Sequence, residues 1–381
     1  MLHSKLRILF YNDSKIYGGH EVMTIKIVHR LLLAGYSITF AFYVDNTNLD
    51  FHLRSLAQNF AKQLTLYPSK ICSGHIQGVM SFIQWLDLYR LYRLIKGKFD
   101  VICASQGNFE LSSKILLTAK LARVKLISYI PGDFTPSSLG LPFAWLRDIF
   151  VGILLRLPDS YISISPSFVN GLRHKVDTNV KRVYLLENII DLNSSIVLPI
   201  FREFIPPIRL LVVGAMNPVK NQGFILDWLE RNPDFICELT LVGSGELLPS
   251  IEKRVLATAS LRNRIKILGW CEDTQPLILN ADLLLIPSLI EGVPLVMLEA
   301  AALGVPILAT NAYGMADFLP LEMRFEINDF IDFSRKLKYL LDHPNECQRL
   351  VRLNYQRVVD FNDHSTFNDQ VLTIFDDFCF R

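Results

Sequence analysis

Short apolar runs alternate with helix-length segments along the whole chain. Runs of this length, bounded by turn residues, are typical of strands that are buried on both faces. Strand–helix–strand repetition predicts a parallel sheet with helices on both sides, and it occurs twice here. We therefore predict an α/β protein with two doubly wound domains. The strands are expected at residues 6–12, 37–44, 101–105, 125–130, 160–165, 208–215, 237–245, 265–270, 281–288 and 305–310.

The stretch between the two repeats predicts a linker. Residues 196–209 break the pattern and contain two consecutive prolines. We therefore expect an N-terminal domain over residues 1–195 and a C-terminal domain over residues 210–360. The tail at 361–381 has an apolar helical stripe that is too large to leave in water, so it must pack on one of them.

The charge distribution differs between the halves of the 381-residue chain. Residues 1–195 contain 22 Lys and Arg against 13 Asp and Glu, whereas residues 196–381 contain 17 against 24. A basic half suits phosphate groups or an anionic membrane surface. Two halves that differ only in their solvated faces would give the same counts, so both explanations stay open.

Several classes of protein are disfavoured by what the sequence lacks. No apolar run approaches the roughly eighteen residues needed to span a bilayer. The start, MLHSKLRILFYND, resembles a first strand rather than a secretory signal, so we expect a cytoplasmic protein. Six cysteines without C-x-x-C spacing indicate free thiols. No H-x-x-H, H-E-x-x-H or D-x-D spacing indicates a metal site.

Two glutamates stand in an otherwise nearly apolar segment, IPSLIEGVPLVMLEAAALGVPILAT. Glu291 follows a strand, and Glu299 lies within the helix expected from Pro294 to Leu303. Carboxylates are costly to bury without partners. Amides at the helix start can bind a phosphate, while the carboxylates can accept hydrogen bonds from sugar and ribose hydroxyls. A capping carboxylate and a salt-bridged helix glutamate are the purely structural alternative.

Other loops carry glycines and a lysine. In LLVVGAMNPVKNQGFIL, a strand is followed by Gly214, then by Lys220, a suitable point charge for phosphate. In YNDSKIYGGHEV, Gly18 and Gly19 open a helix after the first strand. The G-x-G of LVGSGELL has Leu248 where a dinucleotide fingerprint has its third glycine, so we interpret it as a tight strand–helix turn.

In their order, these elements resemble the retaining glycosyltransferases of the GT-B fold, in family four, which includes sucrose synthases and many bacterial polysaccharide and mannosyl transferases. The resemblance covers essentially the whole chain and is strongest over residues 210–320. It rests on strand–Gly–x5–Lys, on the glutamate pair, and on ENIID, whose Asn188 and Asp191 match the family's Asn-Gly-x-Asp stretch. It implies two Rossmann-like domains facing across a cleft, and a last helix crossing back to the N-terminal domain.

The resemblance also implies roles for residues. Glu291 and Lys220 would be catalytic: the first contacts the donor sugar and supports the transition state, and the second neutralises the diphosphate. Glu299 would bind the ribose hydroxyls. Donor contacts are further expected from Gly18, Gly19, Gly214, Asn217, Gly292, Val293, Leu295 and Val296, and acceptor-side contacts from His20, Asp133 and Asn188.

The chain departs from the family at two positions. Ala215 replaces the arginine that usually follows the glycine of the phosphate strand, so Lys220 and helix amides must stabilise the leaving group. Pro131 stands near the place of a frequent histidine, for which Asp133 or His20 could partly substitute. Because both glutamates and the lysine remain, we interpret these departures as variation within the family.

Two amphipathic segments allow two interpretations. WLDLYRLYRLIKGK, at 85–98, is basic and contains aromatic residues, and RDIFVGILLR, at 147–156, is apolar between arginines. Helices that face the core would have these patterns. An interfacial surface that meets a lipid-linked acceptor would have them too.

We therefore predict an EC 2.4 glycosyltransferase that moves a sugar from a nucleotide-diphosphate sugar to a glycan or lipid-linked acceptor in polysaccharide, lipopolysaccharide or glycolipid synthesis. We expect peripheral contact with an anionic membrane at its inner face, no nucleic-acid partner, no cofactor and no metal. One alternative is a GT-B nucleotide-sugar epimerase, which needs no acceptor. Another is a catalytically silent sugar-nucleotide-binding protein, conceivable because of Ala215 and Pro131.

Overall fold

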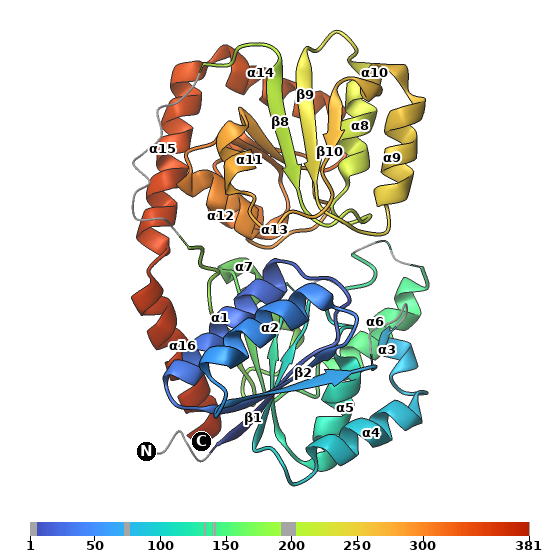
Figure 1. The fold of residues 1–381 in the computed structure, drawn as a ribbon, viewed down its shortest axis with the longest axis vertical. Helices are drawn as coiled ribbons and strands as arrows, with labels where there is room; N and C mark the ends of the chain where they lie inside the picture. Colours follow the sequence, from blue (N-terminus) through green and yellow to red (C-terminus); the bar gives the residue numbers. More distant parts are fainter. Residues whose placement is uncertain are drawn as a thin grey trace. The chain divides into compact units, whose positions relative to one another are not determined.

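The computed structural model consists of two compact units, each built on one parallel sheet (Figure 1). The first unit comprises Met1–Glu187 and His364–Arg381, and the second comprises Asn188–Asp363. The predicted α/β class with two doubly wound sheets is confirmed. The structure describes residues 6–71, 77–132, 135–138, 140, 142–191 and 203–380.

The first sheet has seven strands in the order β3-β2-β1-β4-β5-β6-β7. Each pair of neighbouring strands in it is parallel, as strand–helix–strand repetition requires. The strands are β1 (Arg7–Asn12), β2 (Ser37–Tyr43), β3 (Leu64–Ser69), β4 (Val101–Ser105), β5 (Lys125–Tyr129), β6 (Ser160–Ser163) and β7 (Arg182–Leu185).

Alternate side chains of β1 pack on opposite faces of the first sheet. Leu9 and Tyr11 belong to one buried cluster with Leu91 and Ile115 from the helices on that face. Strand residues alternate between faces, so Phe10 points the other way. The helices of this unit are α1 (Gly19–Leu33), α2 (Thr47–Asn59), α3 (Gln77–Met80), α4 (Trp85–Ile95), α5 (Ser113–Ala122), α6 (Ala144–Leu154), α7 (Pro166–Lys175) and α16 (His364–Phe380).

The last helix, α16, packs on the first unit. The ring of Phe375 lies 5.9 Å from that of Phe10. Asp376 accepts a hydrogen bond from the hydroxyl of Tyr36, and Asp377 pairs with Arg182 on β7. The apolar stripe of the tail therefore covers the face of the sheet to which Phe10 points.

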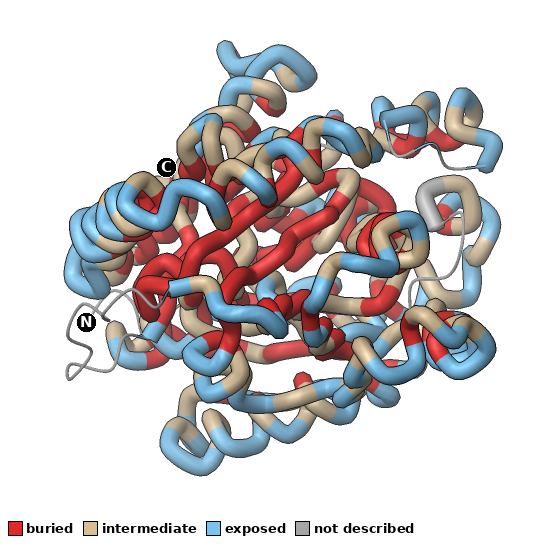
Figure 2. Tube along the Cα trace, turned by 90° about the horizontal axis from the view of Figure 1, so that it is seen from above, coloured by how far each residue is buried: buried red, intermediate tan, exposed pale blue. Residues whose placement is uncertain are grey.

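The second sheet has six strands in the order β10-β9-β8-β11-β12-β13. Leu210 and Val212 of β8 belong to one buried cluster, and Leu211 belongs to another on the opposite face. Figure 2 shows the strands as buried tubes, with exposed turns on the surrounding helices. The strands are β8 (Ile208–Val213), β9 (Cys237–Val242), β10 (Ile265–Ile267), β11 (Leu283–Ile286), β12 (Ile307–Thr310) and β13 (Arg324–Phe325).

Helices cover both faces of the second sheet. Phe224 and Trp228 of α8 pack in the cluster with Leu210, whereas Met297 of α12 packs in the cluster with Leu211. The helices are α8 (Gln222–Arg231), α9 (Leu248–Ala257), α10 (Ala259–Arg262), α11 (Gln275–Asn280), α12 (Leu295–Ala302), α13 (Tyr313–Phe318), α14 (Phe330–Asp342) and α15 (Pro344–Phe361), with a 3-10 turn at Leu321–Met323.

Three strands, β3, β7 and β13, were not predicted from the sequence. Each forms an edge of its sheet, where a strand is short or has one side in water and its apolar signal is weak. The second unit begins at Asn188, which is before residue 195, the expected end of the N-terminal domain. Of the expected linker at 196–209, residues 196–202 lie outside the described residues.

Candidate functional site

Each sheet has a point at which the strand order reverses along the chain. In the first sheet this point lies between β1 and β4, and in the second between β8 and β11. Open parallel sheets bind ligands beyond the carboxyl ends of the strands at such a point. The loops that follow these four strands are therefore where a site is expected, and they contain most of the predicted residues.

An ion pair joins the two loops of the second unit. Lys220, after β8, donates from its Nζ to Oε2 of Glu291, after β11. Their side chains are 27% and 13% exposed, so both groups remain reachable from solvent. Backbone bonds fix the geometry, since Leu289 N donates to Val219 O at 2.8 Å. Asn217 Oδ1 accepts from the amide of Lys220 at 3.0 Å.

Glycines let a third loop pack against the Lys220 loop. A Cβ on Gly243 would lie 2.0 Å from the carbonyl oxygen of Gly214, and one on Gly245 would lie 2.4 Å from that of Met216. Both distances are far inside contact range, so only glycine fits at either position. The structure agrees with the tight turn inferred for LVGSGELL and adds the reason for its glycines.

Another glycine supports the loop of Glu291. A Cβ on Gly314, in α13, would lie 2.5 Å from the carbonyl carbon and oxygen of Gly292. Gly314 N donates to Glu291 O at 3.3 Å. The side chain of Thr310 donates to Ser288 O at 2.5 Å from the end of β12. The backbone on either side of Glu291 is therefore held from two neighbouring elements.

Helix α12 begins directly after this loop. Its first backbone bond runs from Met297 N to Pro294 O at 3.0 Å. The amides of Leu295 and Val296 precede that bond, where a helix has donors to offer a ligand. One turn further on, Glu299 Oε2 accepts from Thr274 Oγ1 at 3.3 Å.

Asn188 belongs to the second unit, as do Lys220 and Glu291, whereas His20 belongs to the first. Its side chain is buried and donates from Nδ2 to Val293 O at 2.7 Å. The amide therefore fixes the chain just before α12. Its Oδ1 is buried without a hydrogen-bond partner among the described residues. The predicted contact of Asn188 with an acceptor stays a prediction.

In the first unit, a hydrogen bond joins the start of α1 to the end of β4. His20 Nε2 lies 2.7 Å from Ser105 Oγ, and Thr24 Oγ1 lies 2.8 Å from the same oxygen. The imidazole stacks on Tyr129, with ring centroids 5.0 Å apart. Burial lowers the pKa of His20 to about 4, so the ring is neutral at pH 7. Its Nδ1 is buried and has no hydrogen-bond partner among the described residues.

The side chain of Glu21 accepts hydrogen bonds at the N-terminus of α1. Its Oε2 accepts from Gly18 N at 2.9 Å, and its Oε1 accepts from Asn12 Nδ2 at 3.2 Å. This is one half of a capping box, because the glutamate accepts from the N-cap amide while Gly18 has no side chain to accept in return. Burial raises the pKa of Glu21 to about 7, opposed by these hydrogen bonds.

The sequence did not single out Glu21 or Ser105. For Ser105 the available signal was position, because a polar residue that ends a buried strand lies at the carboxyl edge of the sheet. Glu21 stands at the third position of α1, where a glutamate can accept from the N-cap amide. Asp133, the other acceptor-side candidate, lies outside the described residues. Among the residues that the structure describes, no group of three or more His, Cys, Asp or Glu side chains could hold a metal ion.

Most of the second unit matches a known protein family. Residues 207–343 match the family model described as "Glycosyl transferases group 1". This region contains Lys220, Glu291 and Glu299, together with the glycines that fix their loops. The match is therefore to the part of the chain in which the ion pair lies.

Characterised bacterial proteins are similar to longer stretches. The chain is 26% identical over 280 residues to the Escherichia coli UDP-Gal:alpha-D-GlcNAc-diphosphoundecaprenol alpha-1,3-galactosyltransferase, covering 67% of this chain and 70% of that protein. It is 27% identical over 189 residues to the Campylobacter jejuni GalNAc-alpha-(1->4)-GalNAc-alpha-(1->3)-diNAcBac-PP-undecaprenol alpha-1,4-N-acetyl-D-galactosaminyltransferase, covering 48% of this chain and 51% of that one.

Solved structures share the whole fold. Anabaena HepE in complex with UDP-glucose superposes with a TM-score of 0.75 at 16% identity, covering 98% of this chain and all of that one. Sucrose-phosphate synthase from Thermosynechococcus elongatus gives a TM-score of 0.74 at 14% identity. At these identities the likeness shows the fold, and the predicted GT-B fold is confirmed.

Proposed function

Because the chain has the GT-B fold and its residues 207–343 match the group 1 glycosyltransferase family, we propose that it is a glycosyltransferase. In this proposal it transfers a hexose, with retention at the anomeric carbon, from a nucleotide-diphosphate sugar to a glycan or lipid-linked acceptor. The observation that carries this proposal is the Lys220–Glu291 ion pair at the strand-order reversal of the second sheet. An ammonium and a carboxylate side by side suit a phosphate and sugar hydroxyls, respectively, which supports the proposal.

The ion pair suggests how the donor is bound. An arriving diphosphate would compete with Glu291 for the ammonium of Lys220, and the carboxylate would then accept hydrogen bonds from the sugar hydroxyls. The amides of Leu295 and Val296 would bind phosphate oxygens, and Glu299 would accept from the ribose hydroxyls. Ala215 offers no charge, so Lys220 is the cation that this loop contributes to the leaving group.

In the proposed reaction, the bond between the anomeric carbon and the diphosphate oxygen breaks, and a bond from the acceptor oxygen forms on the same face. The acceptor hydroxyl's proton passes to the departing phosphate oxygen, and the products are a glycoside and a nucleoside diphosphate. The carboxylate of Glu291 stabilises the positive charge that develops on the sugar ring. No protein side chain acts as the nucleophile in this scheme.

His20 is our candidate for contact with the acceptor. Its ring is neutral and is oriented by Ser105 and Tyr129, so its position is fixed before any substrate binds. A neutral imidazole can accept a hydrogen bond from a hydroxyl without adding charge. Gly18 and Gly19, beside it, leave room for a phosphate or sugar to approach the backbone.

The relatives suggest which substrates to test first. The Escherichia coli protein is named for UDP-Gal and a diphosphoundecaprenol acceptor, and the HepE structure contains UDP-glucose. We therefore propose a UDP-hexose donor and a polyprenyl-diphosphate-linked acceptor, used in surface-glycan synthesis at the inner face of a membrane.

Two measurements test the proposal. Ligands that bind only the folded chain raise its melting temperature, so a panel of nucleotide sugars should give its largest shift with a UDP-hexose. Nucleoside diphosphate release should then depend on added acceptor, and the product's anomeric configuration, read by NMR, should match the donor's. Binding without turnover would indicate a silent binding protein. A new nucleotide sugar formed without acceptor would indicate an epimerase.

A further inference from the structure

Large apolar side chains are exposed on two adjacent elements of the first unit, α4 with the turn before it, and α6. Trp85 is 68% exposed and Trp145 is 70% exposed. A monomeric protein rarely leaves such side chains clustered in water without a function. The other exposed members of this cluster, which we call the aromatic face, are Phe82, Ile83, Leu86, Tyr89, Phe143, Ile149 and Ile153.

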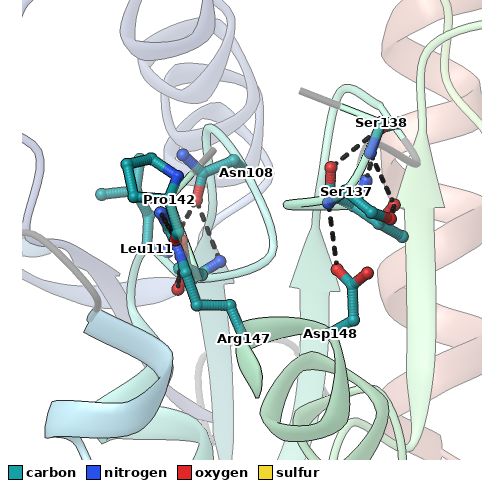
Figure 3. A network of polar contacts seen from close by, with 9 residues as sticks. Asn108, Leu111, Ser137, Ser138, Pro142, Arg147 and Asp148 are labelled. Carbon is teal, nitrogen blue, oxygen red and sulfur yellow. Dashed lines mark hydrogen bonds and ion pairs between the residues drawn. The ribbon is translucent and has the colours of Figure 1, made fainter. Parts of the chain in front are cut away.

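The solvent side of α6 is apolar because the charged residues of this helix are used elsewhere. Arg147 is buried and donates to Glu110 and to Pro142 O. Asp148 accepts from the amide of Ser137 at 3.2 Å. Figure 3 shows the two side chains leaving the helix toward different loops. The stripe left in water contains Trp145, Ile149 and Ile153, at the spacing of one helix face.

The two elements of the aromatic face are joined. The rings of Phe82 and Phe150 lie 5.1 Å apart and tie the turn before α4 to α6. On its inner side, α4 buries Leu91 and Ile95 against the sheet cluster. Lys114 pairs with Asp87, so α4 is fastened by its acidic side chain as well. Both helices are therefore fixed to the unit, and the apolar side chains opposite those anchors face outward.

Positive charge borders the aromatic face. Arg90, Arg93, Lys96 and Lys98 are exposed on α4 and just after it, and Arg156 is exposed just after α6. The only acidic residue from position 82 to 98 is Asp87, which pairs with Lys114 at 2.8 Å and more loosely with Arg90 at 3.6 Å, while Arg90 stays 70% exposed. Tryptophan and tyrosine with flanking Lys and Arg are the side chains that settle at the boundary of an anionic bilayer. A helix long and apolar enough to span a bilayer is absent from the part of the chain that the structure describes.

From this combination we propose that the aromatic face inserts into the interface of an anionic lipid bilayer, with the basic residues of α4 contacting the headgroups. The surface holds the protein in the plane of the membrane without spanning it. It uses none of the residues proposed for donor binding. Its failure and that of the proposed transferase are therefore distinguishable, because lipid binding is measured without any nucleotide sugar.

The first experiment is co-sedimentation of the full chain with vesicles of phosphatidylglycerol and phosphatidylcholine, against vesicles of phosphatidylcholine alone. Binding should require the anionic lipid and should fall as salt rises. The variant Trp145→Ser/Ile149→Ser should bind at least about tenfold more weakly, because it removes inserted apolar area. Arg90→Gln/Arg93→Gln should lose roughly fivefold per residue.

Matched controls lie on the second unit. Ile331→Ser removes a side chain that is 83% exposed on α14, and Lys253→Gln/Lys338→Gln removes two exposed basic residues. These variants should bind vesicles like the unmodified chain. Circular dichroism and melting temperature show whether each variant is folded. Equal binding by folded Trp145→Ser/Ile149→Ser and the parent chain would overturn the proposal.

Tryptophan fluorescence gives a second readout. In a Trp270→Phe background, which removes the exposed tryptophan of the second unit, brominated lipids should quench Trp85 and Trp145. Absence of quenching would contradict insertion even if the protein sediments. A concentration-dependent dimer, lost in Trp145→Ser/Ile149→Ser and unaffected by vesicles, would assign the aromatic face to self-association and overturn the membrane proposal.

Discussion

The two strand-order reversals of this molecule share an architecture and differ in chemistry. In the second unit, the joined loops present a cation and an anion that solvent can reach, Lys220 and Glu291. In the first unit, the corresponding contact is a hydrogen bond between His20 and Ser105, beside a glutamate whose bonds come from neutral donors. Parallel sheets thus supply the location, while the residues after each strand determine which chemistry is possible.

The two glutamates also have different partners. Glu291 is paired with the ammonium of Lys220. Glu21 has an asparagine amide and a backbone amide, and burial raises its pKa to about 7. The second unit is therefore suited to a charged diphosphate, and the first to a neutral hydroxyl-bearing group.

Removing the Lys220–Glu291 ion pair is the strongest test of this difference between the two units. Glu291→Gln and Lys220→Met should each lower turnover by roughly a hundredfold to a thousandfold, the usual cost of losing one group that stabilises developing charge. The melting temperature should change little, because both side chains are partly exposed. Steady-state kinetics measure the effect, with Glu252→Gln and Lys253→Met on α9 as controls. Full turnover by a folded Glu291→Gln protein would rule out the proposed role.

The buried groups of the first unit predict opposing dependences of stability on pH. The pKa of Glu21 is raised from 4.5 to about 7, so its contribution to the unfolding free energy falls as pH rises between these values, by up to about 3 kcal/mol. The pKa of His20 is lowered from 6.5 to about 4, so its contribution rises over that window. The two largely offset each other in the unmodified chain.

Single substitutions should separate these two dependences. In Glu21→Gln the His20 dependence remains, and stability should rise with pH from about 4 to about 6.5. In His20→Gln the Glu21 dependence remains, and stability should fall between pH 4.5 and about 7. Urea unfolding of the full chain at several pH values measures both. Identical pH profiles for both variants would show that these groups are not titrating as inferred.

A smaller effect is expected from the second glutamate of the donor site. Glu299→Ala should weaken UDP-hexose binding by about tenfold to a hundredfold, because hydrogen bonds to a charged acceptor contribute about 1.5–3 kcal/mol. The turnover number should stay close to that of the parent, since a ribose contact is equally present in the ground and transition states. Calorimetry and kinetics together test this split, with Glu252→Ala as control. A fall in turnover without weaker binding would assign Glu299 to the chemical step.

The smallest effect is expected from removing metal ions. If Lys220 and helix amides neutralise the diphosphate, EDTA should leave transfer activity unchanged. Restoration of lost activity by Mg²⁺ or Mn²⁺ would show that the protein's own charges are insufficient. The second unit would then depend on a bound metal ion in addition to Lys220.

The sequence predicted the buried strands and the positions of Lys220 and Glu291 after two of them. It could not show that these residues touch, because the contact depends on β8 lying next to β11 across a stretch of chain that contains two other strands. The same holds for His20 and Ser105, which meet because β1 lies next to β4. Edge strands and the steric role of Gly314 depend on neighbours that no local pattern encodes.

The position of α16 has a consequence for synthesis of the chain. Residues 364–380 complete a unit that begins at the first strand, whereas the second unit is one uninterrupted stretch. On the ribosome, the second unit can therefore fold before the first is complete. Until Phe375 is available to cover Phe10, the part of this sheet face that α16 covers stays exposed to solvent, and we expect chaperones and proteases to recognise it. Chains that terminate before α16 should accordingly be degraded, rather than accumulate with only the second unit folded.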